Sequence, residues 1–99
     1  LGMVIPLTPA ECQAALIDLP GWRMEADALA KTFEFHTFRE AMSFILRVSY
    51  EAEAMNHHPE WTNQYGRVAV RLSTHDAGGK VTLKDCALAQ KIQALSWVG

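Results

Sequence analysis

Two adjacent histidines, His57 and His58, are the residues of this chain best suited to proton transfer, because histidine changes its charge near neutral pH. They follow a long segment without glycine or proline, and Pro59 prevents a helix from continuing past them. The carboxyl end of a helix stabilises a cationic imidazole, so such a pair can also end a helix without any catalytic role. The pair alone leaves both interpretations open.

A third histidine stands in a segment that is typical of a functional loop. His75 follows an alternating, strand-like segment and precedes Asp76-Ala77-Gly78-Gly79, which predicts a flexible turn. Loops that are held by rigid elements often carry functional residues. If the preceding strand packs beside the end of the long helix, His75 lies near His57 and His58 despite its distance from them in the sequence.

Two acidic residues are candidates for the site, and one of them, Glu53, could orient an imidazole. Glu53 precedes His57 by four positions, so the two side chains share one face of a helix and can form a hydrogen bond. Asp85 follows Thr82 by three positions, a spacing that is equally typical of a helix cap. A solvated Glu53 and a purely structural Asp85 are the alternatives that the spacing leaves open.

Two aromatic residues, Trp61 and Tyr65, follow the histidine pair, and either core packing or the wall of a pocket for a flat ring would explain them. His36 is expected at the surface. A zinc site has little support, since adjacent histidines project apart and the helical HExxH spacing is absent. The histidines therefore favour acid–base chemistry without a metal.

Three capping motifs predict where the helices begin. In each, a threonine is followed three positions later by an acidic residue, a spacing that lets both side chains bond the first helical turn. The predicted helices run from Pro9 to Leu16, from Phe38 to Met55, and from the residue after Thr82 to about Trp97. In the second helix, apolar residues recur at steps of three and four, which predicts one face packed on a core.

Between the helices, apolar and polar residues alternate, as in half-buried strands. One predicted hairpin spans residues 22–35 around a turn at residues 26–30, and the second joins residues 61–65 to residues 68–74 across a turn near Gly66. The order of elements is α-β-β-α-β-β-α. It predicts a single α+β domain over residues 3–99, with a four-stranded antiparallel sheet and three helices packed on one face.

Composition excludes several classes of protein. The 99 residues are 49% hydrophobic and 20% charged, which suits one globular domain with a modest core. The net charge of -2 and the pI of about 6.1 argue against binding of nucleic acid. Cys12 and Cys86 lack the spacing of a metal or redox motif, and no apolar run approaches the roughly 20 residues of a membrane span. We expect a cytoplasmic protein, without a signal peptide and with no role for Leu1 and Gly2.

The functional residues, taken together, resemble the pterin-4a-carbinolamine dehydratase family, also known as dimerisation cofactor of a homeodomain transcription factor. The resemblance rests on Glu53-x3-His57-His58-Pro59, Tyr65, the segment Thr74-His75-Asp76-Ala77-Gly78-Gly79, and Asp85, and it covers most of the chain. It implies that His57, His58 and His75 line a pterin pocket. It further implies that Pro59, Trp61 and Asp85 shape or support this pocket, and that Glu53 orients the first imidazole.

The reaction that the resemblance implies fits these residue types. A 4a-hydroxytetrahydropterin loses water to give quinonoid dihydropterin, a step of tetrahydrobiopterin recycling, and hydroxide leaves only with a proton from an acid. His57 and His75 would form the acid–base pair, and His58, also counted as catalytic, would orient the substrate and could share in proton transfer. No metal or organic cofactor is implied, because a ring nitrogen of the substrate supplies the electron pair.

The resemblance also implies a second class of function. Members of the family act as protein partners that stabilise a transcription-factor dimer, and they associate with themselves as dimers or tetramers. We therefore keep a dimerisation cofactor, or transcriptional coactivator, as the alternative function, and a metal-binding domain as a third. The complete histidine motif favours the enzyme, because an interaction module would not need it.

Overall fold

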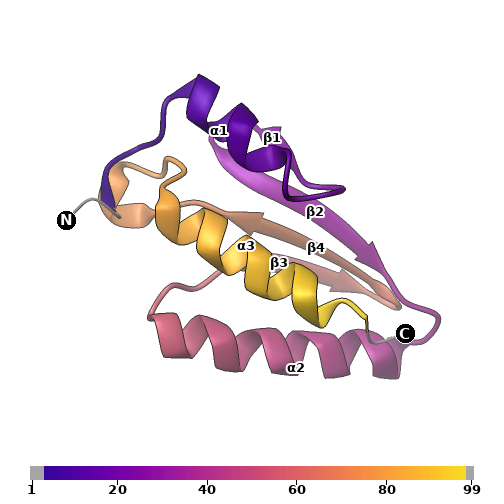
Figure 1. The fold of residues 1–99 in the computed structure, drawn as a ribbon. Coiled ribbons are helices and arrows are strands. Elements are labelled where there is room, and N and C mark those ends of the chain that lie inside the picture. The colour runs from indigo at the N-terminus through magenta and orange to yellow at the C-terminus, as the bar shows by residue number, and fades with distance from the viewer. Residues whose placement is uncertain (1–3, 98–99) are drawn as a thin grey trace.

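The computed structural model describes residues 4–97 and confirms the predicted α+β class and the order of elements (Figure 1). The helices and strands are α1 (Pro9–Leu16), β1 (Arg23–Glu25), β2 (Ala28–Glu34), α2 (Phe38–Met55), β3 (Glu60–Gln64), β4 (Arg67–Leu72) and α3 (Leu83–Leu95), with a short 3₁₀ turn, η2 (His75–Ala77), before α3. Leu1, Gly2 and both ends of the predicted domain, residues 3 and 98–99, lie outside the described residues. No helix within residues 4–97 is long and apolar enough to cross a membrane.

The four strands form one antiparallel sheet in the order β1-β2-β4-β3. Phe33 of β2 is opposite Val68 of β4, and Trp61 of β3 is opposite Val70, so these four side chains share one face of the sheet. Figure 1 shows α2 and α3 side by side on one face of the sheet, running in opposite directions. The predicted packing of the helices on one face is thereby confirmed.

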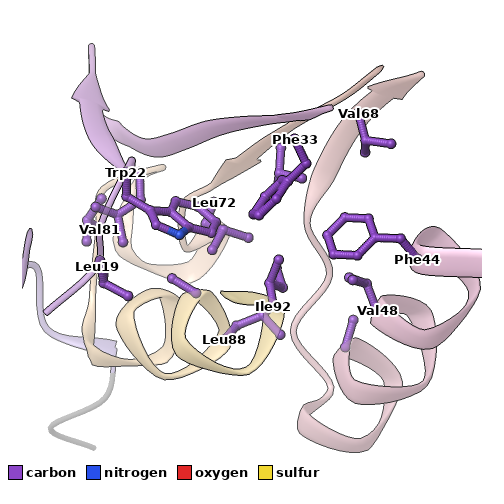
Figure 2. Packing of buried hydrophobic residues seen from close by; sticks show 14 of the residues in the cluster. Leu19, Trp22, Phe33, Phe44, Val48, Val68, Leu72, Val81, Leu88 and Ile92 are labelled. Carbon is purple, nitrogen blue, oxygen red and sulfur yellow. The ribbon is translucent and has the colours of Figure 1, made fainter. Parts of the chain in front are cut away.

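The core lies between this face of the sheet and the helices. Phe44 of α2 is fully buried, and its ring centroid lies 4.8 Å from that of Phe33 and 4.9 Å from that of Phe35. Leu88 and Ile92 of α3 complete the contact with the sheet (Figure 2). These contacts fix α2 and α3 relative to β4, which matters because the functional residues lie where these three elements end or begin.

All three helices begin with the predicted capping box. Thr8, Thr37 and Thr82 are the N-caps of α1, α2 and α3, and the acidic residue three positions later bonds back to each cap. These bonds satisfy backbone N–H groups that the first helical turn leaves without partners. The helix starts that the sequence predicts are therefore those of the structure.

Two strand boundaries differ from the sequence predictions by more than a single residue. The first turn consists of Ala26 and Asp27 alone, because residues 28–30 already belong to β2, where Ala28 and Ala30 pair with β1 and are buried. Alanine has little intrinsic preference for strands, so burial and pairing override local propensity here. At the other end, β4 ends at Leu72, and Thr74 instead forms an isolated bridge to Lys80.

Gly66 explains the position of the second turn. A Cβ atom at this residue would collide with the carbonyl oxygen of Phe35, whose N–H donates to the Gly66 carbonyl at 2.8 Å. The close approach of these two backbones requires glycine. The turn therefore lies at Tyr65 and Gly66, at the end of β4 that is far from His75.

Candidate active site

His57, His58 and His75 line one cavity of about 270 Å³. The cavity lies where the end of α2, the segment after β4 and the first turn of α3 meet. Its remaining lining residues are Asn56, Ser73, Asp76 and Lys84. Two segments that are distant in the sequence thus place imidazoles around the same space, as expected for a site of proton transfer.

The end of α2 directs His57 inward. Asn56 adopts the left-handed conformation, with φ of 50°, and this turns the chain sharply after Met55. The backbone N–H of His57 then closes the helix by donating to the carbonyl of Ala52 at 3.0 Å. Only 8% of His57 is exposed. Its Nε2 lies 2.6 Å from Oδ1 of Asp85, a residue of α3.

Asp85 is fully buried at the start of α3 and has several hydrogen-bond partners. Its second oxygen, Oδ2, accepts from the hydroxyl of Thr74 at 2.7 Å and from the backbone N–H of Thr82 at 2.8 Å. The positive end of the α3 dipole also favours negative charge at this place. Asp85 therefore caps the helix, as its spacing from Thr82 predicts, and contacts His57 at the same time.

Glu53 does not contact His57. Its Oε1 lies 2.9 Å from Nε2 of His58, and both side chains are largely exposed to solvent. The prediction that Glu53 orients His57 is therefore wrong. It assumed that α2 continues to His57, whereas the left-handed Asn56 rotates His57 away from Glu53 and toward Asp85.

The other predicted residues lie outside the cavity. Pro59 is half-buried and separates the histidine pair from β3. Trp61 packs against the edge of the core and borders a small hollow of about 80 Å³ that lies along the sheet. Tyr65 is exposed in the turn at the far end of β4, and His36 is also exposed, as predicted. Within this single chain, the structure thus brings His57, His58, His75 and Asp85 together but not Trp61 or Tyr65.

Lys84 and Asn56 line the cavity, although sequence reasoning did not select them. The position of Lys84 could have indicated a function. A cation in the first turn of a helix faces the positive end of the helix dipole and is unfavourable there. Asn56 also carried a signal, since asparagine is among the few residues that adopt the left-handed conformation at a helix end. Ser73 and Asp76 had no comparable signal.

Two further observations concern other binding modes. Among residues 4–97, no group of three or more histidine, cysteine, aspartate or glutamate side chains has an arrangement that could hold a metal ion.

A larger cavity, of about 510 Å³, lies beside α1, with Leu7, Met24 and Val81 in its walls. No histidine lines this larger cavity.

The fold and the histidine cavity define a small α+β protein with a site suited to proton transfer. The family model for pterin 4 alpha carbinolamine dehydratase matches residues 5–95. A protein of Opitutus terrae that carries the name pterin-4-alpha-carbinolamine dehydratase as a provisional assignment is 61% identical over 93 residues, which cover 94% of this chain and 96% of that protein. The chain belongs to the pterin-4a-carbinolamine dehydratase family.

Two further similarities agree with this assignment. A protein of Afipia carboxidovorans with the same provisional name is 51% identical over 87 residues, which cover 85% of each chain. The crystal structure of a transcriptional coactivator/pterin dehydratase from Brucella melitensis is 38% identical, with a TM-score of 0.88, and the match covers 92% of this chain and 98% of that one. The fold of the family is therefore the fold of this chain.

Proposed function

We propose that this protein dehydrates 4a-hydroxytetrahydropterin to quinonoid dihydropterin, as a step of tetrahydrobiopterin recycling. Membership of the family supports the reaction class. The observation that carries the proposal is the cavity in which His57, His58 and His75 face the same space, with His57 held by a buried carboxylate. Imidazole side chains can serve as both the acid and the base of a proton-transfer reaction.

The proposed reaction needs one acid and one base. The acid protonates the 4a-hydroxyl so that it leaves as water, while the electron pair of a ring nitrogen forms the new double bond. The base then removes the proton from a ring nitrogen, so charge and atoms balance. We assign His57 and His75 to these two roles and His58, which Glu53 holds at the rim, to orienting the substrate. The electron pair comes from the substrate, so the proposal involves no metal or cofactor.

The rate of quinonoid dihydropterin formation tests this proposal. The wild-type protein should accelerate the loss of water well above the uncatalysed rate. Because each proton transfer typically contributes about 10²–10⁴-fold, His57→Ala and His75→Ala should each lower kcat by a factor in that range. His36→Ala is the matched control, since His36 is exposed and outside the cavity, and it should leave the rate unchanged. A wild-type rate equal to the background, or full activity in both cavity variants, would exclude the proposed reaction.

We also propose that α2 mediates association with further protein chains, as a homodimer or homotetramer and secondarily with a transcription-factor partner. Phe38, Leu46 and Tyr50 of α2 are 55%, 55% and 65% exposed, although large apolar side chains are usually buried. The solved structure from Brucella melitensis is named as a coactivator as well as a dehydratase. In sedimentation experiments, the molecular mass of the wild-type protein should be larger than that of a monomer. The mass of the Leu46→Glu variant should be close to that of a monomer. A monomeric wild type would contradict this proposal.

The cytoplasm is the proposed location of the protein. Cys12 and Cys86 are free thiols in the structure, and a reducing compartment keeps such thiols unpaired. Fractionation of cells with an antibody against the protein would test the location, and recovery from a secreted or membrane fraction would contradict it.

A further inference from the structure

A chain of hydrogen bonds runs from the start of α3 to His57. The backbone N–H of Lys84 donates to Oγ1 of Thr82 at 3.2 Å, Oγ1 of Thr82 lies 2.7 Å from Oγ1 of Thr74, and Thr74 donates to Oδ2 of Asp85 at 2.7 Å. The other oxygen of Asp85 contacts Nε2 of His57 at 2.6 Å. Thr74 and Thr82 are 3% and 0% exposed, so water does not replace these bonds.

The direction of each hydrogen bond follows from the groups involved. A carboxylate only accepts, so the hydroxyl proton of Thr74 points at Asp85. The lone pair of Thr74 then accepts the hydroxyl proton of Thr82, whose own lone pair accepts from the Lys84 N–H. All donors in the chain point the same way, toward one buried carboxylate, and such chains strengthen their members.

This direction determines which nitrogen of His57 carries a proton. Asp85 accepts at Oδ1, so Nε2 of His57 must donate to it. In the neutral ring, Nδ1 is then the nitrogen with the free lone pair. Nδ1 has no hydrogen-bond partner in the described part of the chain, and His57 lines the cavity.

We propose that Thr74 is a positioning residue, whose hydroxyl holds Asp85 so that His57 keeps its proton on Nε2 and presents Nδ1 to the substrate. This inference rests on the proposed function for its role in the reaction. Thr74 itself does not line the cavity, so in this proposal it acts through Asp85. Nδ1 of His57 is then the atom that exchanges a proton with the pterin.

Thr74→Val and Thr74→Ser are the matched variants. Valine keeps the shape of threonine but removes the donor, so Oδ2 of Asp85 loses one bond and the hydroxyl of Thr82 loses its acceptor. Serine keeps the hydroxyl. Val70→Ala, which removes buried apolar contacts from the neighbouring strand, is the control for simple destabilisation.

The ¹⁵N chemical shifts of the His57 ring, recorded without any substrate, test the inference. In wild-type protein and in Thr74→Ser, the neutral ring should carry its proton on Nε2 only. In Thr74→Val the Asp85 carboxylate loses the hydroxyl that holds it and can turn away from Nε2 of His57, so both tautomers should appear. The kcat for dehydration should fall about tenfold with little change in KM, a factor that one hydrogen bond to a charged group can supply. Val70→Ala should keep the wild-type shifts.

Two results would overturn the inference. One is a wild-type ring protonated on Nδ1, and the other is a Thr74→Val protein whose ring shifts and kcat equal those of the wild type. Because the shifts need no substrate, they decide the tautomer even if the wild-type protein fails to dehydrate a pterin. A missing wild-type activity would instead contradict the proposed function.

Discussion

His57 and Asp85 are 28 residues apart in the sequence, yet Nε2 of the histidine lies 2.6 Å from Oδ1 of the aspartate. The contact joins the end of α2 to the start of α3 and is almost completely buried. A buried acid that is bonded to an imidazole fixes the ring orientation, which is a common requirement of histidines in proton transfer. The pair therefore links the stability of the fold to the chemistry of the site.

The two acidic residues that contact histidines should differ greatly in their effect on stability. Asp85→Ala leaves three buried donors without an acceptor, so it should lower the free energy of unfolding by about 3 kcal/mol or more. Glu53→Ala removes only an exposed pair and should cost less than about 1 kcal/mol. Urea unfolding of the two variants measures the difference. Equal losses would contradict the assignment of Asp85 as the buried anchor of His57.

Lys84 should lower the stability of the fold and strengthen binding of the substrate. Its side chain lines the cavity, and its position in the first turn of α3 is unfavourable for a cation. Lys84→Met should therefore raise the free energy of unfolding by about 0.3–1 kcal/mol, while KM for the pterin rises more than kcat falls. Steady-state kinetics and thermal unfolding measure the two effects. A variant that is less stable with an unchanged KM would show that Lys84 is merely structural.

Phe44 should be the most sensitive position of the core. It is fully buried between Phe33 and Phe35, so Phe44→Ala leaves a cavity and should cost about 3–5 kcal/mol. Ile17→Ala is the control, since Ile17 is 82% exposed and its loss should change stability by less than about 0.5 kcal/mol. A similar effect of both substitutions on the urea midpoint would contradict the packing described above.

The two cysteines should react slowly in the folded protein. Burial raises the pKa of both the Cys12 and the Cys86 thiol above the ordinary value of 9.0, so less thiolate is present at a given pH. Alkylation by iodoacetamide at pH 8, followed by mass spectrometry, should be much slower than in urea. The raised pKa values also mean that the folded state holds the two thiol protons more tightly than the unfolded state does. The free energy of unfolding therefore keeps this contribution below pH 9.0 and loses it as the pH rises above 9.0. Rapid alkylation of Cys12 in the native protein would contradict its burial.

Local signals were sufficient to predict most of the fold. The three capping boxes depend on residues three positions apart, and the bounds of α1 and α2 follow from them together with apolar periodicity. The first turn was misplaced because Ala28 and Ala30 belong to a strand only through pairing and burial. Such tertiary effects leave no trace in the local composition.

The site was harder to predict than the fold, because its contacts are not local. The local spacing of Glu53 and His57 suggested a pair on one helix face. Because Asn56 ends that helix, His57 instead contacts Asp85. The position of His75 beside the other histidines depends on the packing of the segment after β4 against α2 and α3. The aromatic ring of Trp61 is typical of a pocket wall, although in this chain Trp61 borders the sheet rather than the histidine cavity.

A structure of the protein with a bound pterin analogue that lacks the 4a-hydroxyl tests the central claim most directly. We predict that the pterin ring lies in the cavity lined by His57, His58 and His75, with the position of C4a within reach of Nδ1 of His57. A ring bound in the larger cavity beside Leu7 and Val81, with the imidazoles unoccupied, would contradict the account.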